Sequence, residues 1–405
     1  MTASKDVVTI RGVVEDDWTA MTRLGATCFG SFKDPGSLAA WRPMMPAGAA
    51  VVATDGDDGR DIVGMAMYLD LQLTVPGGAI LPMAGMTWVA VAPTHRRRGV
   101  LRAMYTELHG RIIDARYPVA GLLASEAGIY GRFGYGPATL EHNVRVDRRN
   151  AHFHPDVPDA GGVRVIEPAA HRDDLAAVYE RWRLQRPGGL NCPTGLWDEV
   201  LADRESNRWG GSQLMALLHP DGLVLYRVHH GDDTQSVKVT DFYALTDGAH
   251  IALWRVLIGM DLMDTVSATT YPADPLPYLL TDPRLARITS TEDGLWLRLI
   301  DIPAVLEARA YLGDLSVVLD VGDGFLRSAG RYALSITDGR ATCVPTDAAA
   351  DVHLDVSVLG SLYFGVHRAS TLAAAHRLGC TDSGLLNALD VAFGSEVPAH
   401  LGYGF

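Results

Sequence analysis

The chain has 405 residues, of which 48% are apolar and 20% charged, and its formal net charge is −13. This length exceeds one ordinary hydrophobic core, so we expect two or three domains of a globular protein. The acidic balance argues against a nucleic-acid partner, whose phosphates it would repel, and it is compatible with cationic substrates. Charges or prolines interrupt every long apolar run, and residues 1–8 lack an apolar core, so we expect neither a membrane span nor a signal peptide.

The four cysteines are widely separated and form no CxxC pair. This spacing predicts a reducing, cytoplasmic location, without a disulfide framework or a zinc site. His152 and His154 have the alternate spacing of metal ligands, but they lie in a polar stretch with no partner cysteine. We therefore expect no metal cofactor.

The first 150 residues predict a mixed α/β domain. The expected elements are strands at 62–74, 83–91 and 120–124 and a helix at 99–116. Pro76-Gly77-Gly78 forms the turn between the first two strands, and Pro93 ends the second because proline cannot donate to a ladder. The domain is expected to close near Asn150.

The rest of the chain predicts two further units. Residues 152–162 are rich in Pro, Asp and Gly and are typical of a linker. Strands at 214–228 and 237–245, followed by a helix at 249–263, repeat the outline of the first unit, although no internal sequence repeat is visible. The order of expected elements then changes to helices at 302–311, 356–364 and 383–393 with several short strands among them. This order indicates a third domain of α+β type.

The segment Val89–Arg102 carries the chemistry, because it lies at the turn from a strand to a helix. Such a turn aims backbone N–H groups and the positive end of a helix at one point, which suits a pyrophosphate. Gly99 allows a close backbone approach, and the Arg96-Arg97-Arg98 triplet adds positive charge. A basic triplet alone is more often a solvated helix start. A Walker phosphate loop is excluded because no Gly-Lys-Ser/Thr follows. A Rossmann fingerprint is excluded because the Gly-x-Gly pair and the later acidic residue are missing.

Arg96-Arg97-Arg98-Gly99-Val100-Leu101 resembles the Arg/Gln-x-x-Gly-x-Gly/Ala loop of the Gcn5-related N-acetyltransferases, with Leu101 replacing a small residue. This departure, together with Ser125–Thr139, resembles the Eis (enhanced intracellular survival) subfamily of actinobacteria. The similarity extends along nearly the whole chain and includes Tyr179–Arg183, Asp274–Pro277 and Leu359–Tyr363.

The resemblance implies a fold of α+β (mixed α/β) class with three domains. These are an acetyl-CoA-binding acetyltransferase domain at 1–150, a degenerate acetyltransferase-like domain at 151–297 and a sterol-carrier-protein-like domain at 298–405. Only Thr246-Asp247-Gly248 separates the second domain's expected strand and helix, which supports the loss of its cofactor loop. The resemblance also implies a homohexamer, and it leaves secretion in some actinobacteria open.

The resemblance implies acetyl transfer from acetyl-CoA to amines of aminoglycoside antibiotics and to lysine side chains of peptides and proteins. It places the cosubstrate at Val89, Ala90, Val91, Arg96, Arg97, Arg98, Gly99, Val100 and Ser125. It assigns the general acid to Tyr130, whose phenol can protonate a leaving thiolate. By chemistry alone this role and simple packing are equally supported.

The resemblance assigns the base to the main-chain carboxylate of Phe405. An α-carboxyl has a reference pKa of about 3.5 and is a weak base unless it is desolvated. A frayed terminus is the default for chain ends, but Leu401–Phe405 is apolar and aromatic. The implied amine pocket contains Phe29, Phe32, Trp41 and Trp88, which equally suit an ordinary core.

Some relatives carry acidic residues where this chain has Ser31 and Gly404. The resemblance therefore does not determine which amines are acetylated. A competing function is a lipid- or acyl-binding module in the C-terminal domain, which rests on fold-level analogy alone.

Overall fold

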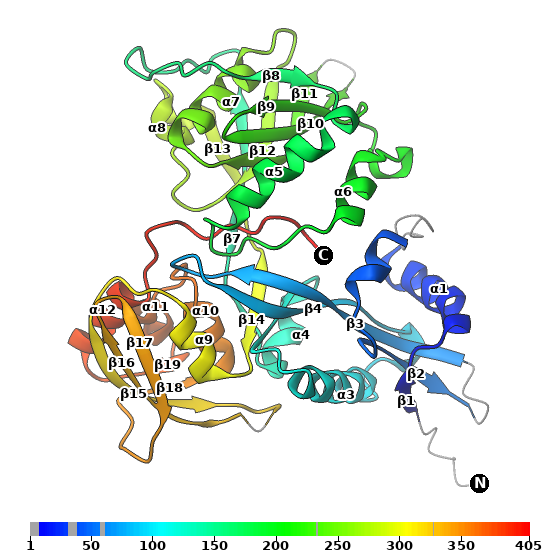
Figure 1. Ribbon diagram of the computed structural model, residues 1–405, viewed down its shortest axis with the longest axis vertical. Coiled ribbons are helices and arrows are strands. Elements are labelled where there is room, and N and C mark those ends of the chain that lie inside the picture. The colour runs from blue at the N-terminus through cyan, green and yellow to red at the C-terminus, as the bar shows by residue number, and fades with distance from the viewer. Residues whose placement is uncertain (1–7, 31–38, 57–60, 232–233, 327) are drawn as a thin grey trace.

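The computed structural model describes residues 8–30, 39–56, 61–231, 234–326 and 328–405. Within these residues the chain forms three β-sheets, each covered by helices, and Figure 1 shows them as three lobes. The C-terminal segment, red in Figure 1, runs between the lobe of the second sheet and the lobe of the first.

The first sheet contains the N-terminal strands and one strand from much later in the chain. Its spatial order is β1 (Thr9–Gly12), β2 (Ala50–Asp55), β3 (Asp61–Thr74), β4 (Ile80–Val91), β5 (Val119–Leu123), β14 (Leu295–Leu299) and β6 (Gly136–Pro137). Helices α1 (Trp18–Phe29) and α3 (Val100–Asp114) pack against β3 and β4, and α4 (Ala127–Tyr130) follows β5. β3 is apolar along most of its length because the helices leave little of it exposed.

The second sheet has the spatial order β13 (Ala286–Asp293), β7 (Leu140–Asp147), β12 (Thr265–Thr270), β11 (Gln235–Ala244), β10 (Gly222–His230), β9 (Met215–His219) and β8 (Arg164–Ile166). Its helices are α5 (Arg172–Arg183), α6 (Thr194–Leu201), α7 (Asp247–Gly259) and α8 (Leu276–Leu279). β7 precedes residue 150 yet pairs with β12 and β13, while β14 returns to the first sheet between β5 and β6. A boundary at residue 150 therefore does not follow the sheets, because they exchange strands across it.

The third sheet has the order β17 (Arg340–Pro345), β16 (Gly330–Thr337), β15 (Leu315–Gly322), β18 (Val352–Asp355) and β19 (Leu378–Gly379). The helices around it are α9 (Ile302–Ala308), α10 (Val356–Leu362), α11 (Ala369–Ala374) and α12 (Ser383–Ala392). Leu319, Leu334, Leu359 and Leu389 are each at most 2% exposed, so apolar side chains fill the space between the sheet and these helices.

Most of the expected elements are confirmed with shifts of a few residues at their ends. The expectation for residues 214–228 needs a correction, because β9 and β10 are two strands of a hairpin that turns at Pro220 and Asp221. The helix expected at 249–263 begins earlier, at Asp247, and ends at Gly259. Its start differs because the Thr246 side chain accepts a hydrogen bond from the backbone N–H of Ala249 and caps the helix.

A buried arginine joins the first sheet to the third domain. Arg298 of β14 is fully buried and donates through Nη2 to Asp323 Oδ2 at 2.6 Å and through Nη1 to the Phe133 carbonyl at 2.5 Å. Asp323 follows β15, and Phe133 ends the short helical turn after Tyr130. Burial opposes the ionisation of Asp323, but the hydrogen bond from Ser328 and the charge of Arg298 outweigh it and hold the pKa of this carboxyl below its usual value.

None of the helices in the described parts of the chain is both long enough and apolar enough to cross a bilayer. No group of three or more His, Cys, Asp or Glu side chains in those parts is arranged to hold a metal ion.

We expect Arg298→Met to lower the free energy of unfolding by about 3–5 kcal/mol, because Asp323 is left charged and buried without its partner. Chemical denaturation at neutral pH measures this loss. The double variant Arg298→Met with Asp323→Asn should recover part of it. Glu107→Gln, which breaks an exposed pair with Arg111, should cost less than about 1 kcal/mol. A loss as small in Arg298→Met as in Glu107→Gln contradicts the role of the buried pair.

Candidate active site

The central feature of the first sheet is a slot between β4 and β5. These parallel strands pair only from Met83 with Val119 to Met86 with Leu122. β4 then continues to Val91 while β5 ends at Leu123, so among the described residues no strand pairs with this edge of β4 beyond Met86. Free N–H and C=O groups on such an edge can pair with an extended, amide-bearing chain.

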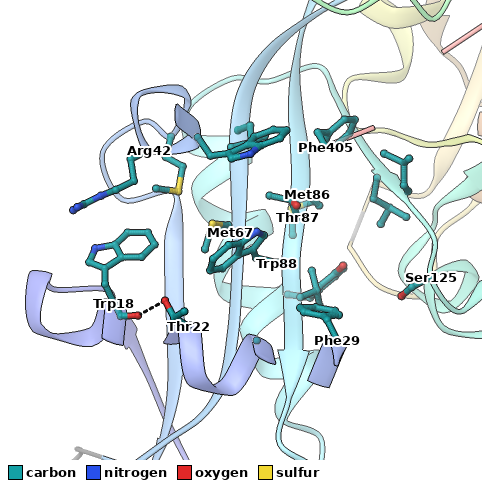
Figure 2. A pocket seen from close by; sticks show the side chains of 18 of the residues that line it. Trp18, Thr22, Phe29, Arg42, Met67, Met86, Thr87, Trp88, Ser125 and Phe405 are labelled. Carbon is teal, nitrogen blue, oxygen red and sulfur yellow. Dashed lines mark hydrogen bonds between the residues drawn. The ribbon is translucent and has the colours of Figure 1, made fainter. Parts of the chain in front are cut away.

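A β-bulge lies on β4 at the slot. Its pairing with β3 shifts between Met65 and Met67, so that Trp88 and Val89 together face the single residue Ala66. Trp88 has a φ of 51°, a left-handed conformation that is costly for a bulky residue. Strain of this kind persists where the surrounding structure imposes it, and it often marks a functional site. Both residues of the bulge line the cavities beside it, and Figure 2 shows the Trp88 side chain in one of them.

The loop from β4 to α3 has the geometry of an anion site. Arg97 and Gly99 have positive φ values of 62° and 83°, and α3 begins directly afterwards at Val100. This backbone presents the N-terminus of a 15-residue helix to the groove beside it. A Cβ on Gly99 would meet nothing within 4 Å, so the glycine is needed here for its φ value and for a close approach from outside.

Two cavities meet at this slot. The loop groove, about 880 Å³, runs along the β4–α3 loop and contains eight of the nine residues expected to bind the cosubstrate: Val89, Ala90, Val91, Arg96, Arg97, Gly99, Val100 and Ser125. The aromatic pocket, about 320 Å³, lies on the other side and is shown in Figure 2. Phe29, Val89, Ser125 and Tyr130 line both cavities, so these four residues mark the junction.

The aromatic pocket takes its rings from separate parts of the chain, and Tyr105, Tyr130 and Phe405 are among them. Trp18 and Phe29 come from α1, Trp88 from the bulge of β4, and Trp41 from the segment before β2. Figure 2 shows Phe405 at the upper end of the pocket, Phe29 at the lower end and Trp88 between them. Among the described residues that line this pocket, none is an aspartate or a glutamate. Phe405 lines the pocket as well.

Tyr130 ends α4 at the junction and is 6% exposed. Burial raises the pKa of its phenol, and the charge of Glu126 adds to this, while a hydrogen bond with Ser125 opposes it. The phenol therefore keeps its proton at neutral pH. Its ring packs near Tyr105 of α3, with centroids 6.4 Å apart.

The C-terminal segment is bound along its length. The His400 backbone N–H donates to Pro187 O at 2.9 Å, and the Tyr403 hydroxyl donates to Asn191 O at 2.7 Å. Leu401 is 5% exposed, and the ring of Phe405 packs close to Gly85 of β4. The terminus is thus ordered at the aromatic pocket, which the frayed-end alternative does not predict.

Two of the expected site residues are not placed in the cavities. Phe32, like Ser31, lies outside the described residues. Arg98 does not line either cavity, and its charge acts instead on Asp55, whose pKa is lowered first by His95, then by the Gly56 backbone and also by Arg98. Sequence reasoning missed several lining residues: Trp18, Thr22, Arg42, Met45, Met67 and Tyr105. They come from α1, α3, β3 and the segment before β2, where nothing in the sequence pattern separates pocket residues from core residues.

Comparison with known proteins agrees with this geometry. Two family models, each described as an acetyltransferase (GNAT) domain, match residues 9–138 and 188–299, and a sterol carrier protein domain matches residues 302–402. The chain is 55% identical to N-acetyltransferase Eis of Mycobacterium tuberculosis, across 98% of this chain and 100% of the relative. It is 35% identical to an N-acetyltransferase of Streptomyces avermitilis, across 98% and 99%. Among solved structures, Eis1 from Mycobacterium abscessus matches with a TM-score of 0.87 and 31% identity, across 98% and 100%.

The fold and the slot thus define an N-acetyltransferase of the GNAT class, with two GNAT domains and a sterol-carrier-type domain. Within that class, the chain belongs to the Eis family.

Proposed function

We propose that the chain transfers the acetyl group of acetyl-CoA to amines of aminoglycoside antibiotics, and to lysine side chains of peptides. The observation that carries this proposal is the meeting of the loop groove and the aromatic pocket at Val89, Ser125 and Tyr130. A phosphate-binding end and an amine-binding end on either side of one phenol are what direct transfer requires.

The loop groove fits acetyl-CoA by its donors and its charge. Arg96, Arg97 and the N-terminus of α3 would hold the pyrophosphate, and the free edge of β4 would pair with the pantetheine amides. The Val89 backbone N–H at the bulge would polarise the thioester carbonyl, which becomes an oxyanion in the transition state.

The transfer balances with groups at the junction. The lone pair of a neutral amine attacks the carbonyl carbon, the C–N bond forms, and the C–S bond breaks. Tyr130 donates its proton to the departing thiolate. The Phe405 carboxylate accepts the proton lost by the amine, directly or through water, and holds the ammonium form beforehand. Phe405 is half-buried, and partial desolvation of its carboxylate would raise its basicity.

The acceptor follows from the aromatic pocket and the overall charge. Faces of Trp18, Trp41 and Trp88 can hold cationic amines, and a net charge of −13 attracts them. The pocket offers few fixed charges to orient one particular amine. We therefore propose that a polyamine can bind in more than one orientation, so that several of its amines are acetylated.

The lipid-binding alternative receives no support from a specific observation. The apolar interior of the third domain is filled by its own side chains, such as Leu319 and Leu359.

The test of the activity is the reaction itself. Protein mixed with acetyl-CoA and kanamycin should release free thiol, and mass spectrometry of kanamycin should show one or more added acetyl groups. A lysine-containing peptide in place of kanamycin tests the second acceptor class. Thiol release at the background rate with both acceptors contradicts the proposal.

Gly99→Ala should weaken acetyl-CoA binding about tenfold or more, because alanine at a φ of 83° is strained and the loop would shift. Isothermal titration with acetyl-CoA measures this. The matched control is Gly110→Ala in the interior of α3, where a Cβ also meets nothing within 4 Å and the helix should gain about 0.5–1 kcal/mol. Equal affinities in both variants contradict the role of the loop.

Tyr130→Phe should lower kcat about 100-fold or more while leaving the affinity for acetyl-CoA within about twofold, because a positioned acid typically contributes 10²–10⁴. Since the pKa of Tyr130 is raised, its loss of a proton should not reduce the wild-type rate below a pH of about 10. Steady-state kinetics across pH measure both effects. Tyr311→Phe, at a buried phenol that lines neither cavity, is the control. Equal rates in the two variants return Tyr130 to a packing role.

A further inference from the structure

The second domain keeps the slot of an acetyltransferase fold. Its parallel strands β11 and β12 pair only from Ser236 with Thr265 to Lys238 with Ser267. β11 then continues to Ala244, and its pairing with β10 shifts so that Thr240 is an extra, bulged residue. The splay and the bulge thus occur in the same order along β11 as along β4 of the first domain.

The second domain does not keep a phosphate loop. Residues 92–99 separate β4 from α3, whereas only Leu245 and Thr246 separate β11 from α7. The Thr246 side chain already occupies the Ala249 N–H, and Asp247 in the first turn would repel a phosphate. This slot therefore has the shape of a cofactor site without the means to hold a pyrophosphate.

The C-terminal segment crosses the open end of this slot. The Tyr243 hydroxyl of β11 donates to Gly402 O at 2.5 Å and also lies 3.0 Å from Asp241 Oδ1 of the same strand. The ring of His400 lies 5.5 Å from that of Tyr271, which follows β12. Tyr403 and Gly404 line a cavity together with Asp241 of β11 and Thr269 of β12. Tyr243 of β11 and Tyr271, the residue directly after β12, thus contact the segment that ends at Phe405.

Close contacts fix the path of the segment. A Cβ on Gly402 would collide with the Tyr179 hydroxyl of α5. A Cβ on Gly188 would lie 2.9 Å from the carbonyl oxygen of His400. Arg186 Nη1 also donates to Pro398 O at 3.1 Å. The segment therefore has one tightly defined route across the second domain before it enters the first.

We infer that the slot of the second acetyltransferase fold holds the chain's own C-terminal segment, and that Tyr243 is the positioning residue that sets the Phe405 carboxylate at the aromatic pocket. Tyr243 acts through the Gly402 carbonyl, three residues before the terminus, and does not touch the reacting atoms. This inference rests on the proposed function in that it takes the Phe405 carboxylate to act on the amine.

The principal experiment measures the terminus itself, independently of acetyl transfer. Carboxypeptidase A should release Phe405 slowly from the wild-type chain and at least about threefold faster from Tyr243→Phe, because one hydrogen bond to a carbonyl corresponds to roughly this factor or more. Tyr403→Phe, which loses the bond to Asn191 O, is the second variant and should act in the same direction. The matched control is Tyr311→Phe, which removes an equally buried hydroxyl bonded to Leu306 O in the third domain.

Kinetics with acetyl-CoA and kanamycin form the second readout. Tyr243→Phe should lower kcat about three- to tenfold with an unchanged KM for acetyl-CoA, whereas Tyr311→Phe should change neither. Deleting Phe405 should lower kcat further and make the Tyr243→Phe substitution silent, because both act on the same carboxylate.

The outcomes separate the two proposals. Full activity after deletion of Phe405 overturns the catalytic role of its carboxylate. The release experiment then still decides whether the slot holds the C-terminal segment. Release of Phe405 from Tyr243→Phe and Tyr403→Phe at the rate of Tyr311→Phe overturns the inference, whatever the deletion shows. Circular dichroism and the unfolding midpoint identify a variant that has lost its fold, and the remaining variant of the pair then decides.

Discussion

The ion pair between Arg298 and Asp323 is the interaction on which the arrangement of the molecule depends. Both side chains are fully buried, and a buried charge is tolerated only where a partner and further hydrogen bonds compensate for the lost water. The same guanidinium also donates to Phe133 O, directly after the helix that ends at Tyr130. A single side chain thus joins β14, the third domain and the turn that carries the proposed acid.

The strand exchange places Arg298 in the first sheet. β7 joins the second sheet and β14 returns to the first, so the two sheets share their chain in both directions. Separating them would expose strand edges on each, which is costly. The first and second domains therefore act as one unit, and a residue of the second domain can position a group in the first with little loss through relative motion.

The sequence predicted local features well and assembled features poorly. The β4–α3 loop was predictable because its pattern, from Val89 to Arg102, is contiguous and its chemistry follows from backbone geometry. The exchange of β7 and β14 was not, since the alternation of a strand does not say which sheet it joins. Trp18 and Arg42 gave no signal either, because their place in the pocket arises from the packing of α1 and the following segment onto β3 and β4. Arg98 belongs to the basic triplet, but its charge acts on Asp55 and lowers the pKa of that carboxyl. Spacing alone does not separate Arg98 from its two neighbours in the loop groove.

The two groups proposed to move protons reach the pocket by different physical means. Tyr130 ends a short helix, and the turn that follows accepts a hydrogen bond from the buried Arg298 at Phe133 O. Its position is therefore fixed by packing in the interior. Phe405 ends an extended segment without helix or strand, whose position depends on side-chain hydrogen bonds and on close packing around Gly402. Ordering this segment costs conformational entropy for each of its residues, and the segment has no helix or strand hydrogen bonds of its own to offset that cost. It therefore needs a surface that fits it closely. A second acetyltransferase fold that retains its slot but not its phosphate loop supplies such a surface, which gives a physical reason for its presence beside an intact one.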